Sequence, residues 1–439
     1  MDNINIVFFA IPLLFFFLAM RIPVSISLIL VGSFGVILFS GWTALTVQLK
    51  TSAWHLFSSY SFSVIPLFLL MGNFASKAGL NATVFNLSNA FIGHLRGGLA
   101  MSTMGACAGF GAICGSSLAT VATMSKISLP ELEKNNYSSS FSTATLAAGG
   151  TLGILIPPSI ILIVYSILTE QNISKMFAAA LFPGILALIF YIITIYIYTF
   201  FYPSHAPKGK YIPWKKRIKY LFKIWKLFLI FFVVIGGIYF GFFTPTEGAA
   251  IGSGLTGLMF LFSKNFGFSQ LLDVIEETAV TTGMIFLIVL GAEFFNSFIA
   301  LSRFPTELGE IVISTGLSPH LILMIFLLIY IVLGCFMDSF AMILLTIPIF
   351  FPILNELDFG MSAENFAIWF GVLTLVVVEV GLITPPFGLN VLIVNKLAKN
   401  TGLYETYVGI IPYLISDFFK ITLLFFFPSI SLTFVEYLF

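Results

Sequence analysis

The sequence predicts an all-α polytopic membrane protein built from two inverted repeats, each with one re-entrant hairpin and one broken helix. Hydrophobic residues make up 59% of the 439 residues, charged residues make up 9%, and the mean hydropathy is +1.06. Soluble domains carry about 25% charged residues, so this composition excludes them. A glycine followed by two prolines occurs twice inside long apolar runs, at 153–158 and 381–386. Breaks of this kind at corresponding places in two halves are typical of secondary transporters.

Apolar runs mark the simple membrane spans. The first run follows Met1-Asp2-Asn3, which lacks the basic n-region of a signal peptide, so we expect this run to be a retained span. The last run, 405–434, is interrupted by Pro412 and by the charged pair Asp417 and Lys420. The other runs cover 4–20, 23–40, 62–76, 174–201, 221–243, 246–263 and 281–301.

Two longer segments, 137–169 and 363–399, carry the glycine and proline residues at their centres. As one straight helix each would be about 50 Å long, which exceeds a hydrocarbon core of ~30 Å. Each is therefore predicted to be two half-helices joined by an unwound waist. Before each lies an apolar stretch with a polar, glycine-containing centre, at 97–130 and 319–353. Neither arm of these stretches is long enough to cross the membrane, so each is predicted to be a re-entrant hairpin.

The basic residues predict the orientation of the chain. Eight of the 20 Lys and Arg residues lie between Lys208 and Lys226. Because cytoplasmic loops are enriched in Lys and Arg, this stretch is predicted to be cytoplasmic, with both termini outside. The same assignment brings the first hairpin in from the cytoplasm and the second from outside, so the repeats are inverted.

Three amphipathic, lightly charged stretches predict helices that lie along the membrane surface. One precedes each hairpin, Asn81 to Leu95 and Arg303 to Ile313, and the third covers Phe268 to Val280. A separate motif, Thr244-Pro245-Thr246-Glu247, matches a helix-capping pattern, with Thr244 as the N-cap and Glu247 at the third helical position.

The hairpin tips and the waists carry the candidate ion ligands. Sodium is a hard cation, and unwound carbonyls, hydroxyls and carboxylates supply the oxygens that it needs. Ser116 and Ser117 also fit the simpler role of small residues at a close helix contact. Asp338 and Glu379 are costly inside a membrane, but either could cap a half-helix, or carry a proton in a proton-coupled transporter. The predicted cation-binding residues are Gly115, Ser116, Ser117, Gly153, Pro157, Asp338, Ser339, Glu379, Gly381, Thr384 and Pro385.

An anionic substrate would favour the N-termini of the half-helices, where unpaired N–H groups and the positive end of the helix dipole gather. Proline at a helix start is also ordinary helix chemistry. No arginine is predicted at the midplane, so recognition would depend on dipoles, hydroxyls and bound cations. The predicted substrate-binding residues are Ser116, Pro158, Ser159, Pro386 and Asn390.

Other functional classes lack support in the sequence. Its 3 cysteines and 4 histidines have no metal-ligand spacing, and no His, Cys or carboxylate constellation indicates a membrane enzyme or respiratory subunit. We therefore expect no catalytic residues, no transition metal and no organic cofactor. The net charge of +1, without a basic and aromatic surface, gives no reason to propose nucleic acid as a partner.

At these residues the chain resembles the large membrane subunit of a tripartite ATP-independent periplasmic (TRAP) transporter, the DctM-like family. The resemblance extends over essentially the whole chain, and its long proline motifs are specific. It rests on Gly115-Ser116-Ser117, on the segment from Ala147 to Ser159, on Phe243-Thr-Pro-Thr-Glu247, and on the segment from Glu379 to Asn390.

The resemblance implies import of organic acids, such as C4-dicarboxylates, sugar acids or sialic acid, across the bacterial inner membrane, with Na⁺ as the coupling ion. It also implies a separate small four-helix membrane subunit and a soluble periplasmic substrate-binding protein. A self-sufficient sodium- or proton-coupled dicarboxylate or ion transporter of similar architecture is the alternative. An elevator mechanism is implied, with the transport domain at 77–170 and 281–399, and the scaffold at 1–76, at 171–280 with its basic loop 203–226, and at 400–439.

Overall fold

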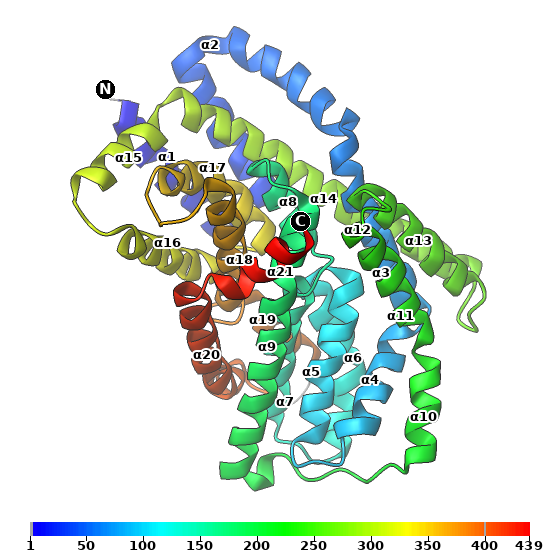
Figure 1. The fold of residues 1–439 in the computed structure, drawn as a ribbon. Helices are drawn as coiled ribbons and strands as arrows, with labels where there is room; N and C mark the ends of the chain where they lie inside the picture. The colour runs from blue at the N-terminus through cyan, green and yellow to red at the C-terminus, as the bar shows by residue number, and fades with distance from the viewer. Residues whose placement is uncertain (1–2, 399–400) are drawn as a thin grey trace.

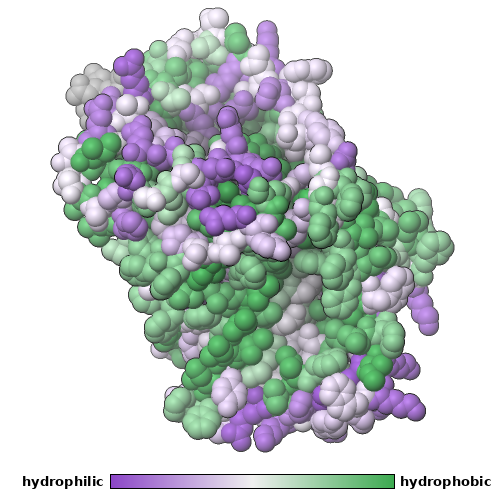
Figure 2. Space-filling model, viewed as in Figure 1, coloured by the Kyte–Doolittle hydropathy of each residue, from purple (hydrophilic) through white to green (hydrophobic). Residues whose placement is uncertain are grey.

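The computed structural model describes residues 3–398 and 401–439, so the predicted domain boundary at 399 and 400 lies outside the described residues. The described chain is all-helical apart from one isolated bridge between Arg96 and Lys208. Hydrophobic residues form a broad band between polar residues gathered in the upper part of the molecule and along its lower rim (Figure 2). Among the described residues, five helices are long and apolar enough to cross a membrane, or up to eight spans if each bent pair counts as one. The predicted all-α polytopic class is confirmed.

One group of helices lies outside the hairpins and the broken helices, and it contains two of the long spans. α2 (Val24–Ser58) and α14 (Phe268–Leu301) run side by side in the upper part of Figure 1, and α3 (Val64–Lys77) packs against α13 (Pro245–Leu261) and α14. The contact between α2 and α14 is close because Gly32 has no side chain: a Cβ there would lie 2.5 Å from the backbone of Phe294. The group also includes α1 (Asn3–Ala19), the short η1 (Tyr60–Ser63), and the span formed by α10 (Trp214–Lys223), α11 (Trp225–Phe231), η3 (Phe232–Gly236) and α12 (Gly237–Tyr239).

Both predicted hairpins are present. In the first repeat α5 (Gly98–Cys114) turns into α6 (Ser117–Lys134), and in the second α16 (Pro319–Gly334) turns into α17 (Ser339–Asn355). Each hairpin packs against the broken helix that follows it. The structure therefore places the turns at the polar centres that the sequence indicates.

Both predicted broken helices are also present. α7 (Ser139–Leu155) and α8 (Ile160–Leu168) meet at an angle of 47°. α18 (Ala363–Gly381) and α19 (Leu389–Leu397) are separated by a longer unwound stretch. Each second half-helix packs against the hairpin of the other repeat, α19 against α6 and α8 against α17, so the two repeats interlock.

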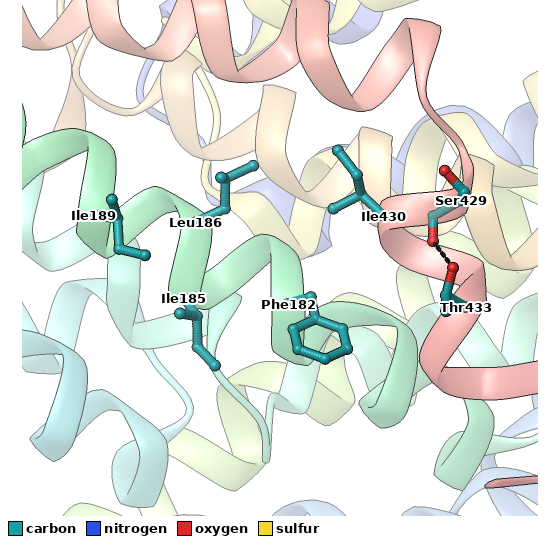
Figure 3. A pocket seen from close by; sticks show the side chains of 7 residues that line it. All are labelled: Phe182, Ile185, Leu186, Ile189, Ser429, Ile430 and Thr433. Carbon is teal, nitrogen blue, oxygen red and sulfur yellow. Dashed lines mark hydrogen bonds between the residues drawn. The ribbon is translucent and has the colours of Figure 1, made fainter. Parts of the chain in front are cut away.

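Two long helices join this hairpin bundle. α9 (Ile173–Phe201) and α20 (Leu403–Phe426) pack against each other, and both contact α7 and α18. The sequence predicts that both segments belong to the scaffold, whereas their packing groups them with the broken helices. α21 (Ser429–Leu438) lies on α9. An open apolar groove of about 450 Å³ separates these last two helices (Figure 3), and its side chains have the character of a lipid-facing surface. Inside α21 the Thr433 hydroxyl donates to the Ser429 carbonyl, so the groove presents little free polar chemistry.

The observed helices agree only in part with the predicted amphipathic helices and with the predicted interruption of the last span. α4 (Leu80–Ile92) and α15 (Phe304–Ser314) match two of the predicted amphipathic helices. The third, 268–280, is not separate but is the first part of α14, because no proline or turn signal interrupts the chain before Thr281. The last span continues through Pro412 and breaks instead at Pro428. A short η2 (Pro203–His205) begins the basic loop.

Candidate cation and substrate site

The tip of the first hairpin lies directly against the first waist. Gly115 adopts a left-handed φ of 62°, which lets α5 end and α6 begin within two residues. Ser116 is the N-cap of α6, where its Oγ accepts the Ala119 N–H at 3.4 Å. A Cβ placed on Gly153 would lie 2.5 Å from Thr120 Oγ1 and 2.8 Å from the Ser116 carbonyl oxygen. Glycine at 153 therefore lets two oxygens of the tip approach the waist backbone.

The first waist is buried throughout. All residues from 151 to 160, including Pro157 and Pro158, are covered by protein. Ser159 is the N-cap of α8, and its Oγ accepts the Leu162 N–H at 3.4 Å. The Pro158 carbonyl faces Gly115, where a Cβ would lie 2.9 Å from the carbonyl oxygen. Pro157, Pro158 and Ser159 thus sit at a half-helix N-terminus opposite a hairpin tip, as the sequence predicts.

Asn390 connects the second repeat to the first waist. Its Nδ2 donates to the Ala147 carbonyl of α7 at 3.2 Å, and a Cβ on Gly150 would lie 3.3 Å from the same nitrogen. Asn390 lies in the first turn of α19, which packs on α7. A residue predicted from the second repeat therefore contributes to the site of the first.

The second tip holds its two polar residues in different ways. Asp338 is the N-cap of α17, and its Oδ1 accepts the N–H groups of Phe340 at 2.9 Å and Ala341 at 3.0 Å. Ser339 instead donates its hydroxyl to Oε1 of Glu379 at 2.9 Å. Asp338 therefore caps α17, which is one of the roles that its sequence position allows. Glu379 is the carboxylate that joins the tip to the broken helix.

Glu379 also lies next to the first repeat. Ser117, at the tip of the first hairpin, is close to its carboxylate. Glu379 is 1% exposed, so both serines approach it within the protein interior. The structure thereby brings together Ser117, Ser339 and Glu379, one from each tip and one from the second broken helix.

The second waist is more open than the first. Pro385, Pro386 and Phe387 are exposed, and the Thr384 hydroxyl donates back to the Val380 carbonyl at 2.7 Å. Tyr407 of α20 braces this stretch by donating its hydroxyl toward the carbonyls of Pro386 and Phe387 at 2.7 and 2.8 Å. No single accessible surface unites the predicted substrate residues, because Ser159 and Asn390 are buried whereas Pro386 is exposed.

Three buried oxygens at these junctions have no hydrogen-bond partner within the described chain: Thr120 Oγ1, Glu379 Oε2 and Asn390 Oδ1. Buried polar atoms are nearly always paired, so each unpaired one calls for an explanation. Hydroxyl, amide and carboxylate oxygens are the donor types that a hard cation such as sodium takes. The residues at the two junctions thus fit a sodium ion in chemistry.

Several residues near the candidate site could not be identified from the sequence. Asp417 and Lys420 stand out only as a charged pair in an apolar segment, and Tyr191 and Tyr407 look like ordinary span residues. The carboxylate that Tyr191 contacts lies 226 positions away in the sequence, and the carbonyls that Tyr407 contacts lie 21 and 20 positions away, so only the fold reveals these contacts.

An all-helical membrane bundle with two interlocked hairpin and broken-helix units is the architecture of a membrane transporter. The profile of one family, the DctM component of tripartite ATP-independent periplasmic transporters, matches residues 11–430. The chain belongs to this family and is a transporter permease subunit rather than an enzyme.

The similar proteins agree with this assignment. The C4-dicarboxylate TRAP transporter large permease protein DctM of Pseudomonas aeruginosa is 33% identical over 416 residues, which cover 94% of each protein. The isethionate TRAP transporter permease protein DctMQ of Oleidesulfovibrio alaskensis is 28% identical, and the match covers 87% of this chain and 59% of that protein. Among solved structures, the Alcanivorax borkumensis YdaH transporter matches with a TM-score of 0.62 at 14% identity, over 88% of this chain and 89% of that one, which shows a shared fold.

Proposed function

We propose that this chain is the large permease subunit of a sodium-coupled, binding-protein-dependent importer of organic acids. The observation that carries the proposal is the set of buried oxygens that have no partner among the described residues where the tips meet the waists, Thr120 Oγ1, Glu379 Oε2 and Asn390 Oδ1. They supply chemistry that a sodium ion satisfies and that apolar packing does not explain. Na⁺ is accordingly the proposed coupling ion, with Thr120 and Asn390 serving the first half and Glu379 the second.

An elevator movement is part of the proposal. The hairpins, the broken helices, α9 and α20 share one packed core, whereas α2, α3, α13 and α14 form a second packed group beside it. We propose that the first set moves as the transport body and the second serves as the scaffold. In this division 173–201 and 403–426 move with the transport body, in contrast to the boundaries expected from the sequence.

The family and the charge pattern support a proposed location. We propose a multi-pass protein of the bacterial inner membrane, with the basic stretch from Lys208 to Lys226 in the cytoplasm and both termini in the periplasm. The positive-inside distribution of Lys and Arg supports this orientation.

The proposed partners are a small four-helix membrane subunit on a separate chain and a soluble periplasmic binding protein. The relatives named as large permease proteins, such as the DctM relative that the chain matches over 94% of its length, support a small subunit as a partner. The DctM and DctMQ relatives are named for a dicarboxylate and for isethionate, both anions, so an organic anion is the proposed substrate class.

A proton-coupled transporter is the second candidate, and it is favoured by the buried Glu379, one oxygen of which has no partner within the described part of the chain. Both candidates are tested by uptake of radiolabelled organic acids into proteoliposomes. An inward sodium gradient is compared with potassium, with and without the small subunit and candidate binding proteins. Uptake that needs sodium and both partners supports the proposal. Sodium-driven uptake by this chain alone would favour the self-sufficient transporter, and uptake driven by a pH gradient without sodium would favour proton coupling.

A further inference from the structure

Two pairs of residues occupy equivalent places in the two repeats. Tyr191 in α9 and Lys420 in α20 each lie eight residues after the proline of their helix, Pro183 and Pro412. Thr151 and Glu379 each lie two residues before the waist glycine, Gly153 and Gly381. The two sequences differ at these places, with two hydroxyls in the first repeat and two charged groups in the second.

The equivalent residues meet in the centre of the bundle. The Lys420 ammonium lies 5.1 Å from the centre of the Tyr191 ring. Asp417 stands between them, pairing with Lys420 and accepting the Tyr191 hydroxyl on Oδ2 at 3.0 Å. Tyr191 is also 3.1 Å from Thr151 Oγ1 at the end of α7. The resulting chain, Thr151, Tyr191, Asp417 and Lys420, we call the bridge.

The bridge reaches the second waist through charge. The helix that carries Glu379, α18, packs against both α9, which carries Tyr191, and α20, which carries Asp417 and Lys420, so the charges of the bridge and of the Glu379 carboxylate share one buried interior. All of these side chains are at most 1% exposed, so little water screens them. The two waists are therefore joined by a hydrogen bond at one end of the bridge and by electrostatics at the other.

The hydroxyl hydrogens of Tyr191 and Thr151 determine how the bridge could respond to a cation. Ionised Asp417 only accepts, so the single hydrogen of Tyr191 is directed to it. The single hydrogen of Thr151 then has two acceptors, the Tyr191 oxygen at 3.1 Å and the Ala148 carbonyl of α7 at 2.7 Å. A change in the charge around Glu379 alters the strength of the hydrogen bond from Tyr191 to Asp417. It thereby alters which of its two acceptors the Thr151 hydroxyl donates to in the turn before Gly153.

A gain in stability does not by itself explain the buried ion pair of Asp417 and Lys420. A buried ion pair often contributes no more than well-packed apolar residues of similar volume, and ionisable groups inside a membrane protein are usually functional. Resting on the proposed sodium coupling, we propose that the bridge couples the two waists, so that a cation bound in one half raises the affinity of the other half. Asp417, Lys420 and Tyr191 are positioning residues in this arrangement and do not ligate the ion.

The test uses a matched pair of tyrosine variants in the full transporter with its partners. Tyr191→Phe removes the hydroxyl that joins Thr151 to Asp417. Tyr413→Phe is the control, because Tyr413 is equally buried, packs on Tyr191 with ring centres 5.6 Å apart, and forms its hydroxyl hydrogen bond with Thr145 Oγ1 at 2.8 Å. The double variant Asp417→Leu/Lys420→Met removes both charges together and so avoids leaving one charge unpaired. Sodium activation of uptake is measured for each, together with the substrate concentration for half-maximal uptake at saturating sodium.

The expected result is a rise of roughly five- to twenty-fold in the half-saturating sodium concentration for Tyr191→Phe and for the double variant, as expected for loss of a coupling between sites. The steepness of sodium activation should fall toward a Hill coefficient of ~1, because linked sites become independent. The half-saturating substrate concentration should stay within about two-fold of wild type, since the coupling acts on the cations. Tyr413→Phe should match wild type.

Three outcomes overturn the inference while leaving the proposed function intact: a wild-type Hill coefficient of ~1, equal sodium curves for Tyr191→Phe and Tyr413→Phe, or a double variant with unchanged activation. Wild-type uptake that ignores sodium would overturn the proposed function itself. Thermal unfolding of each purified variant in detergent separates misfolding from lost coupling, because a misfolded variant loses maximal uptake without a selective shift in the sodium curve.

Discussion

Gly334 of the second hairpin packs backbone to backbone against Gly381 of the second broken helix, and a Cβ on Gly381 would lie 2.5 Å from the Gly334 Cα. The first repeat has the same contact between Gly111 and Gly153. Each hairpin therefore meets its waist through a pair of glycines. This close approach places Ser339 within hydrogen-bond distance of Glu379 and Thr120 against the first waist.

Gly381→Ala should disrupt the second junction. The added methyl group overlaps backbone, which cannot rotate away, so we expect a loss of about 1–3 kcal/mol in the free energy of unfolding and loss of uptake. Gly254→Ala in α13 is the matched control, because a Cβ there meets nothing within 4 Å and alanine favours a helix. Thermal unfolding in detergent and uptake in proteoliposomes measure both effects. Equal behaviour of the two variants would show that the junction is looser than described.

Thr120→Val should separate ion binding from stability. Because Thr120 Oγ1 is buried and unpaired among the described residues, replacing the hydroxyl with a methyl group should keep or raise sodium-free stability by ~1 kcal/mol. The stabilisation added by sodium should shrink, since one ligand is lost. Melting temperatures at rising sodium concentrations, with potassium held as the balancing cation, measure this difference.

Ser128→Ala is the control for this experiment. Ser128 lies on the same helix α6 and its hydroxyl is likewise buried and unpaired, but it is two turns beyond Thr120. Its sodium-dependent stabilisation should equal that of wild type. A Thr120→Val protein that responds to sodium as strongly as Ser128→Ala does would remove Thr120 from the cation site.

Much of the fold was predictable because its signals are local. The hairpin turns fall at Gly115 and near Asp338, and the waists at Pro157 and Pro385, where short motifs break helices inside apolar runs. The capping motif at Thr244 was equally readable, and the structure confirms it as a capping box.

The rest could not be read in this way because it depends on long-range packing. Nothing in the sequence near Tyr191 indicates that it will meet Asp417, 226 positions away. The contact of Asn390 with Ala147 likewise depends on the interlocking of the two repeats. The break at Pro428, in contrast with the continuous helix at Pro412, also reflects tertiary packing: α20 remains helical where it is held against α7 and α9.

Asp338→Ser and Asp338→Ala distinguish a cation ligand from a helix cap. Serine can still cap α17 but carries no charge, whereas alanine does neither. If the charge serves the cation, both variants should raise the half-saturating sodium concentration about ten-fold or more, corresponding to ~1.4 kcal/mol. Alanine should also lower the free energy of unfolding by ~1 kcal/mol. Should Asp338→Ser restore the wild-type sodium curve, the carboxylate would be a cap and the second cation site would depend on Glu379 and backbone carbonyls.

Thr244→Val should affect stability alone, although Thr244 lies in a motif that identifies the family. Its hydroxyl accepts the Glu247 N–H at 3.3 Å, while the Glu247 carboxylate accepts the Thr244 N–H at 2.8 Å, so the two residues close the first turn of α13. Valine keeps the shape but loses the acceptor, which should lower the free energy of unfolding by ~1 kcal/mol. Thr244→Ser should restore it. The sodium curve should match wild type in both variants, because α13 packs on α3 and away from the waists. If Thr244→Val shifts the sodium curve and Thr244→Ser restores it, this turn of the scaffold takes part in transport.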